Sequence, residues 1–324
     1  MKLPRRRFLH LAAAAVALPA VSRPARAQTY PSRPVRLIVA TPAGGGDLAR
    51  LMGQWLSERL GQPFVIENRP GAGTNIGTEA VVRAPPDGYT LLLANAASAI
   101  NATLYTKLNF NFIRDIVPVA SIIRQSLVIQ VNPSVPAKTV PEFIAYAKVN
   151  PNKLSMASGG NGAPSHIAGE LFKMMAGVNL VHVPYRGAVP ALTDLLGGQV
   201  QVYFGPMPAS IEFIKTGKLR ALAVTAATRA EALPDLPTVA EFIPGYEASS
   251  WNGVGAPKNT PVEIVDKLNT EINAALADPK MKALITDGLG SMVFPGSPAD
   301  FAKFIAAETE KWAEVIRFAG LKAV

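Results

Sequence analysis

The 324-residue chain contains no cysteine, and this absence removes several kinds of chemistry at once. Disulfides, thiolate metal sites and a cysteine nucleophile are excluded. Histidine is also scarce, with three in the chain, and no H-x-x-x-H or similar spacing suits a metal. A G-x-S-x-G nucleophile elbow is missing as well. We therefore expect no catalytic residue, no metal and no cofactor.

Charged residues and long apolar segments are also scarce. Charged residues make up 17% of the chain, and no segment after residue 27 is apolar over a membrane-spanning length. The formal net charge of +9 is concentrated at the N-terminus, because residues 1–27 hold six basic and no acidic residues and leave +3 for the rest. No block of lysine and arginine remains there, which argues against a nucleic-acid partner.

The first 27 residues have the features of an export signal. Arg5-Arg6-Arg7 is a twin-arginine pattern, residues 11–21 form an apolar run too short to span a bilayer, and Ala25-Arg26-Ala27 offers a small-x-small cleavage site. We expect cleavage after Ala27 and a periplasmic location. Two alternatives remain: an N-terminal membrane anchor, and the general secretory route, since Pro4 stands where Ser or Thr usually precedes the arginines.

After this segment, strand and helix patterns alternate along the chain. Apolar strands are expected at 35–40 and 89–94, and two separate extended pieces between 117 and 131. Strands separated by helices predict βαβ units and largely parallel sheets. Towards the C-terminus, Thr260 begins a capping box with proline at the first helical position, and residues 297–300 open a last helix.

The most informative stretch is 154–187, LSMASGGNGAPSHIAGELFKMMAGVNLVHVPYRG. It predicts a strand, a glycine turn, a helix from near Ser165 and a returning strand. Such a unit aims backbone N–H groups at one point, where an anion binds without a charged side chain. That favours a small-molecule receptor over an enzyme. His182 alternates with apolar residues and is interpreted as a core histidine, and His166 as a residue that shapes the loop.

Three other motifs leave alternatives open. The glycines before Asp47 suit either an anion site at a helix start or a plain tight turn. Residues 71–77 have the spacing G-x-G-x-x-x-G, one residue longer than a dinucleotide fingerprint, so a structural loop is preferred. Arg186 follows a strand, where it serves either as a partner for a ligand carboxylate or as a structural residue.

Nine segments together carry a resemblance that covers residues 28–324. They are PAGGGDLAR (42–50), ENRPGAGTNIGTE (67–79), DGYTLLL (87–93), SGGNGAPSHIAGELF (158–172), VPYRGAVPALTDLL (183–196), KLRALAVT (218–225), LPDLPTVAE (233–241), GYE (245–247) and WNGVGAP (251–257). In this order they resemble the extracytoplasmic solute receptors of tripartite tricarboxylate transporters, the Bug family.

The resemblance implies an α/β protein with the type II periplasmic-binding-protein fold. Lobe 1 is expected to comprise 28–123 plus 247–324, and lobe 2 to comprise 124–246. Such receptors hold a small organic carboxylate between the lobes and deliver it to membrane permease subunits of a tripartite tricarboxylate transporter. The implied protein is a monomer. A signalling receptor that presents its closed form to a sensor is the alternative, and an exported enzyme is a third possibility.

The resemblance also implies which residues bind the ligand. They lie in two loops and at two strand ends: Thr41, Pro42, Ala43, Gly44, Gly45, Asn95, Ala96, Ser98, Ser158, Gly159, Asn161, Gly162, Ser165, His166, Gly205 and Pro206. The chain departs from the family pattern at the first loop. Thr41 replaces a usual aromatic residue, and Asp47 stands one position early.

Overall fold

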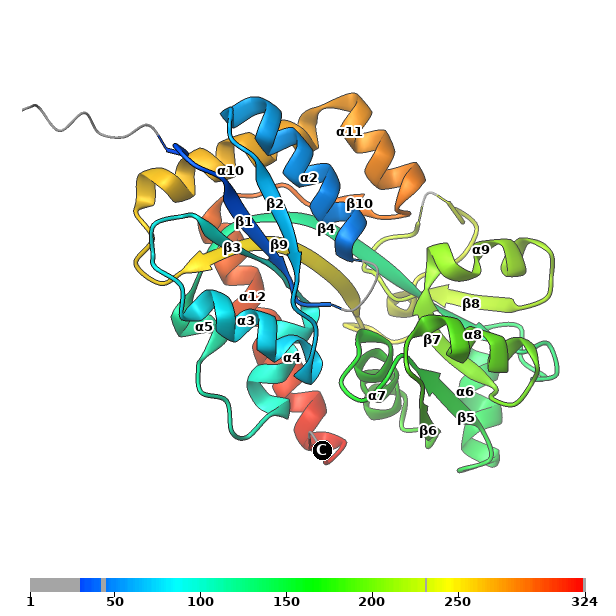
Figure 1. The fold of residues 1–324 in the computed structure, drawn as a ribbon. Coiled ribbons are helices and arrows are strands. Elements are labelled where there is room, and N and C mark those ends of the chain that lie inside the picture. Colours follow the sequence, from blue (N-terminus) through cyan, green and yellow to red (C-terminus); the bar gives the residue numbers. More distant parts are fainter. Residues whose placement is uncertain (1–29, 42–44, 231, 323–324) are drawn as a thin grey trace, which may run out of the picture.

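The computed structural model describes residues 30–41, 45–230 and 232–322 (Figure 1). The predicted signal peptide, its cleavage site and three residues of the predicted first loop (Pro42, Ala43 and Gly44) lie outside these ranges. None of the helices within the described ranges combines the length and apolar character that crossing a membrane requires.

The first part of the chain alternates strand and helix, as predicted. Its elements are β1 (Val35–Val39), α2 (Gly45–Leu60), β2 (Phe64–Asn68), α3 (Asn75–Val82), β3 (Thr90–Asn95), α4 (Ala96–Leu104) and α5 (Phe112–Asp115). β1 pairs in parallel with both β2 and β3. Gly61 ends α2 in the left-handed conformation that glycine adopts without strain, at φ 72°.

A single long strand, β4 (Ile116–Val131), then carries the chain away from this group. The prediction of two separate extended pieces was wrong. The register slips near Pro118 and near Ser121, so β-bulges bend the strand without ending it. The elements that follow are α6 (Val140–Val149), β5 (Ser155–Ser158), α7 (Pro164–Ala176), β6 (Val181–Pro184), α8 (Ala188–Leu196), β7 (Val202–Pro206), α9 (Met207–Lys215) and β8 (Arg220–Val224).

The chain returns to the first group through β9 (Ser249–Pro257). It ends with α10 (Val262–Ala277), α11 (Pro279–Ala283), a π-helical turn (Leu284–Gly288), β10 (Met292–Val293) and α12 (Pro298–Phe318). The helix start predicted at Ser297 is confirmed, and Ser297 forms a capping box there with Asp300. The capping box predicted at Thr260 is wrong, because its hydroxyl donates to the Pro257 carbonyl at 2.8 Å and Pro261 precedes the helix.

The ten strands of the described residues form one sheet in the order β2-β1-β3-β9-β4-β7-β5-β6, with β8 and β10 also paired to β4. β9 is antiparallel to both β3 and β4, and β7 and β8 are antiparallel to β4. The expectation of largely parallel sheets is therefore wrong at the centre. The antiparallel strands arise because the chain crosses on β4 and returns on β9.

Two lobes meet at these crossing strands, as Figure 1 shows. β4 pairs with β9 as far as Ser126 and with β7 and β8 from Leu127 onward. We call the β1–β3, β9, β10 side lobe 1 and the β5–β8 side lobe 2. The lobe boundaries predicted at 123/124 and 246/247 remain a proposal. Helix α12 packs on α4 and β4 and also on α7 of lobe 2, so the C-terminal helix contacts both sides.

Candidate functional site

The carboxyl ends of three strands meet at one edge of lobe 2. β5 pairs in parallel with β6 and with β7, and each strand leads within a few residues into a helix, α7, α8 or α9. Helix N-termini leave backbone N–H groups without intrahelical partners, so this edge carries positive potential. The crevice outside the carboxyl ends of such strands is the usual ligand site of α/β proteins.

The loop between β5 and α7 is held in shape by its own side chains. The Gly160 N–H donates to Ser158 Oγ at 3.1 Å, and the same oxygen lies 2.6 Å from His182 Nε2. The Gly159 N–H donates to Ser165 Oγ at 2.9 Å. Ser165 therefore joins the loop to the first turn of α7.

A buried charged cluster lies beneath this loop. His166 accepts the Gly162 N–H at Nδ1 over 3.1 Å, so in the neutral ring Nε2 carries the proton, 3.7 Å from Glu170 Oε1. Lys173 Nζ lies 2.8 Å from Glu170 Oε2. Burial opposes ionisation of Glu170, but its interactions with His166 and Lys173 outweigh that effect and lower its pKa. His182 is half-buried against His166, which places it in a polar cluster and not in an apolar core.

A cavity of about 190 Å³ opens beside the loop. Its walls come from the β5–α7 loop, the starts of α8 and α9, and the crossing strands: Gln125, Leu127, Gly159, Ala163, Pro164, Ser165, Ala188, Tyr203, Pro206 and Ser250. None of these side chains is charged. Burial raises the pKa of the Tyr203 phenol to about 12, so this group stays neutral. The cavity therefore offers hydroxyls, amides and the N-terminus of α7 to a ligand.

Gln125 and Ser250 are functional candidates that sequence reasoning missed. They are directly opposed between β4 and β9, and both line the cavity. The Gln125 amide also donates to the Leu289 carbonyl at 3.4 Å. The signal lay in the alternation of side chains along a strand, which puts Gln125 on the same face as Leu127. The missing information was the pairing with Ser250, far away in the sequence.

Three of the predicted ligand-binding residues line the cavity, namely Gly159, Ser165 and Pro206. Ser158 and His166 support the loop from below, whereas Asn161 is exposed. Gly162 instead lies against lobe 1, since an added Cβ would collide with Leu104 of α4. Its φ of 74° is also a conformation that residues other than glycine rarely adopt.

Other predicted residues lie further from the cavity. Gly205 faces Gln130, whose amide fills the place that a side chain would take. In lobe 1, Asn95 caps α4 by accepting the Ala97 N–H at 2.9 Å, and Ala96 and Ser98 are buried in the first turn. Thr41 is half-buried, and Gly45 begins α2. None of these described lobe 1 residues lines the cavity.

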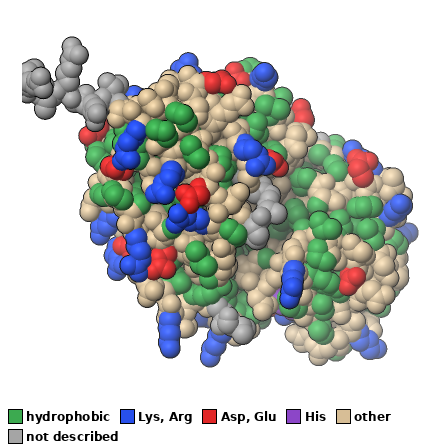
Figure 2. All heavy atoms as spheres, viewed as in Figure 1, with side chains coloured by type: hydrophobic (Ala, Val, Ile, Leu, Met, Phe, Trp, Pro, Cys, Tyr) green, Lys and Arg blue, Asp and Glu red, His purple; other side chains and the backbone are tan. Residues whose placement is uncertain are grey.

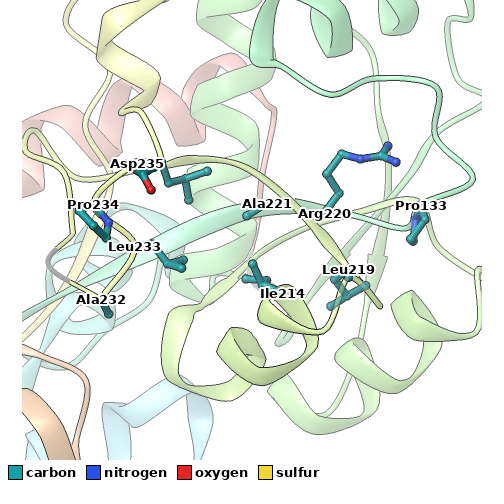
Figure 3. A pocket seen from close by; sticks show the side chains of 11 residues that line it. Pro133, Ile214, Leu219, Arg220, Ala221, Ala232, Leu233, Pro234 and Asp235 are labelled. Atoms are coloured by element: carbon teal, nitrogen blue, oxygen red, sulfur yellow. The ribbon is translucent and has the colours of Figure 1, made fainter.

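A larger cavity, of about 590 Å³, lies elsewhere on lobe 2, between β8, α9 and residues 232–236 (Figure 3). Arg220 and Asp235 lie towards opposite ends of it. The Arg220 guanidinium donates to the carbonyls of Val135 and Ala137 at 2.9 and 3.0 Å, so it is already engaged. No residue implied by the resemblance lines this cavity. We therefore take the smaller cavity, which some of these residues line, as the candidate site.

The surface itself gives further information on partners. Figure 2 shows a surface hollowed between the two lobes, with lysine and arginine side chains interspersed with acidic ones on this face. On this face the mixed charges form no basic stripe of the kind that nucleic-acid binding uses. Within the described ranges, no three acidic or histidine side chains are grouped to hold a metal ion.

Comparison with known proteins gives the family. The model of the tripartite tricarboxylate transporter family receptor, TctC, matches residues 48–321. The chain belongs to this family. Protein BugT of Bordetella pertussis is 37% identical over 313 residues, which cover 95% of each chain.

Solved structures agree in fold. R. palustris Rpa4515 with adipate superposes with a TM-score of 0.80 at 37% identity, over 91% of this chain and 100% of that one. MatC (Rpa3494) from Rhodopseudomonas palustris with bound malate gives 0.76 at 30% identity, over 89% and 100%. The two-lobed periplasmic-binding-protein fold and the Bug-family assignment are confirmed. TctC proteins are receptors and not enzymes, so the family also confirms that prediction.

Proposed function

We propose that this TctC receptor captures a small organic carboxylate in the periplasm and delivers it to the membrane subunits of a tripartite tricarboxylate-type transporter. The observation that carries the proposal is the uncharged cavity of about 190 Å³ at the N-terminus of α7. Two relatives of this fold hold adipate and malate. A carboxylate is the group that backbone N–H donors and a helix N-terminus stabilise without a cation.

In the proposed complex the ligand carboxylate meets Ser165 and the start of α7, and its far end meets Gln125 and Ser250. These groups line the cavity together. A hydrogen bond to a charged group contributes about 1.5–3 kcal/mol, so a few such donors supply useful affinity. The described residues at the starts of α2 and α4 do not line the cavity, so closure of the lobes is proposed to bring them over the ligand.

A stability screen tests the proposal. Residues 28–324 are unfolded in urea with adipate or malate, and with the matched neutral diamides as controls. A ligand at one hundred times its Kd raises the free energy of unfolding by about 2.7 kcal/mol. We expect stabilisation by a carboxylate and none by its diamide, with a smaller radius of gyration in solution scattering. Stabilisation by amines or sugars, with no carboxylate effective, contradicts the proposal.

Export and delivery need their own tests. Intact-mass analysis of the periplasmic fraction is expected to find residues 28–324, and Arg5→Lys with Arg6→Lys is expected to block export if the twin-arginine route is used. Full-length protein in the cytoplasm or membrane contradicts cleavage after Ala27. For delivery, deletion of the gene is expected to abolish uptake of the labelled ligand. Uptake that persists in the deletion strain argues against a transport role.

A further inference from the structure

A third cavity, of about 220 Å³, lies between the two lobes. Ser126, Met207 and Thr228 form its lobe 2 side, and Lys282 and Val293 form its lobe 1 side. It adjoins the π-helical turn that follows α11, a kind of irregularity common at functional sites. We call it the hinge cavity, because both lobes contribute to it where the chain crosses between them.

The crossing strand separates the hinge cavity from the proposed carboxylate cleft. Along β4, Gln125 and Leu127 line the cleft, whereas Ser126 between them lines the hinge cavity. Neighbouring residues also line different cavities at the end of β7, where Pro206 lines the cleft and Met207 lines the hinge cavity. Successive side chains of a strand point to opposite faces. The two cavities therefore lie on opposite faces of one hinge.

A hydrogen bond also connects the two cavities. Gln125 lines the cleft, and its amide donates to the Leu289 carbonyl at 3.4 Å. The next residue, Gly290, lines the hinge cavity and packs on Pro208, the second residue of α9. A movement of lobe 1 at residues 289–290 therefore changes contacts with side chains that line both cavities.

The lining of the hinge cavity specifies a class of ligand. Met207, Ala230 and Val293 offer apolar surface, and methionine side chains adapt to the shape of what they contact. Lys282 is the one charged residue among the described lining residues, and its side chain is exposed at the rim. A dry cavity of about 150 Å³ holds a benzene ring. The hinge cavity has room for a ring with one small substituent.

We propose that the hinge cavity is a second ligand site, for a small single-ring monocarboxylate, and that its ligand opposes closure of the cleft. The ring packs on Met207 and its neighbours, and the carboxylate meets Lys282. Rotation about β4 that closes the cleft on one face separates the lobes on the other. A molecule that contacts both lobes across the hinge cavity is then released, so the two ligands weaken each other reciprocally.

Methyl NMR tests the site with benzoate as the probe. The protein carries Gly159→Val to block the cleft, so that benzoate does not bind there. Benzoate is expected to shift the methyl signals of Met207 and Met292, which both line the hinge cavity. Thr228→Trp, a substitution at an exposed lining residue, is expected to abolish these shifts. Absence of the shifts, or their persistence in the tryptophan variant, overturns the site.

Charge selectivity is tested with lysine variants and a neutral probe. Lys282→Gln is expected to weaken benzoate by about threefold to fivefold, the range of an exposed ion pair, and to leave benzyl alcohol unchanged. Lys280→Gln is the matched control, since Lys280 belongs to the same short helix but lines a different cavity. Equal loss in both variants, or tighter binding of benzyl alcohol than of benzoate, overturns the carboxylate assignment.

Coupling is measured in the protein with an intact cleft. Saturating benzoate is expected to raise the Kd of adipate by about fivefold, the low end of allosteric coupling, and adipate to raise that of benzoate equally. Direct competition inside the cleft would persist in Thr228→Trp, whereas coupling through the hinge disappears in it. An unchanged adipate Kd overturns the coupling. If adipate does not bind at all, the carboxylate proposal fails while the benzoate result stands by itself.

Discussion

The imidazole rings of His166 and His182 are stacked, with their centroids 3.6 Å apart and their planes inclined by 8°. One ring belongs to α7 and the other to β6, and each contacts a different part of the loop between Ser158 and Gly162. Protonation of both rings would place two positive charges next to each other. The loop that borders the cleft therefore rests on a stacked pair of rings.

We predict that His182 makes stability fall between about pH 7 and pH 5. Burial, followed by repulsion from His166 and Lys173, lowers the pKa of His182 to about 4, with Glu170 opposing. In this window the unfolded chain takes up a proton that the native protein does not, so the free energy of unfolding decreases as pH falls. The ring is half-buried and solvent screens it, so we expect a loss of about 1 kcal/mol.

Urea unfolding at the two pH values measures this effect. His182→Gln is expected to be less stable at neutral pH but to lose this part of the pH dependence. Carboxylates with lowered pKa, such as Glu170, change stability only at lower pH, so they leave the window clear. An unchanged slope in the glutamine variant means that another group is responsible.

The second prediction concerns the hinge. Arg124 of β4 pairs with Glu247, donates to Ser249 Oγ at 3.0 Å, and lies over the rings of Phe294 and Phe304 at 5.2 and 5.1 Å. Arg124→Met removes the charge-assisted hydrogen bonds but keeps the aliphatic packing. We expect it to cost about 1–2 kcal/mol of stability, a discounted figure because both side chains are partly exposed.

Glu247→Gln is the matched comparison for this pair. It keeps an acceptor for Arg124 and removes only the charge, so a loss below about 1 kcal/mol is expected in the same urea experiment. A larger loss for Glu247→Gln than for Arg124→Met would mean that leaving the Arg124 charge without its counterion costs more than removing the arginine.

Local signals in the sequence predicted local structure well. The capping box at Ser297 and the glycine end of α2 at Gly61 each depend on a few adjacent residues. The same signature failed at Thr260, because a turn brings the Pro257 carbonyl within reach of its hydroxyl. Local helix propensity contributes little free energy, so a competing hydrogen bond of this kind overrides it.

Tertiary packing decided what sequence patterns missed. Strand β9 contains Gly253 and Gly255, and glycine is a poor strand former. The structure shows why glycine is needed, since a Cβ on Gly253 would collide with Phe301 and the Ala120 carbonyl. The candidate site combines both kinds of information. The loop before Ser165 is continuous in sequence and could be predicted, whereas its partners on β4 and β9 are brought together only by the fold.

A third prediction follows for Gln125. Its volume is close to that of methionine, so Gln125→Met removes polar atoms from the cavity wall with little change in shape. Affinity for a dicarboxylate whose far end reaches Gln125 is expected to fall about tenfold, from the loss of one hydrogen bond to charge. A monocarboxylate of equal length is expected to bind as before.

Calorimetry with the two ligands measures this difference, and Gln54→Met serves as the control. Gln54 lies on α2, where its amide bonds to Glu58, far from the cavity wall. If Gln125→Met weakens both ligands alike, the residue acts through the hinge and not through contact with the far carboxylate.

The last prediction concerns the loop and the start of α7. Ser165→Ala removes the acceptor of the Gly159 N–H and a hydroxyl from the cavity. We expect carboxylate affinity to fall at least about tenfold, since one hydrogen bond to a charged group is lost. Ser210→Ala is the matched control, because Ser210 is a buried helical serine whose hydroxyl donates to carbonyls of the preceding turn.

Gly159→Ala distinguishes a loss of affinity caused by blocking the cavity from one caused by destabilising the fold. An added Cβ at Gly159 meets nothing closer than 3.7 Å, and no positive φ stands in its way, so the folded protein accommodates the methyl group. Because Gly159 lines the cavity, that methyl occupies space that the carboxylate needs for close approach to the backbone. Stability in urea is expected to be unchanged while affinity falls by more than in Ser165→Ala. Retained affinity in Gly159→Ala would place the carboxylate elsewhere in the cleft.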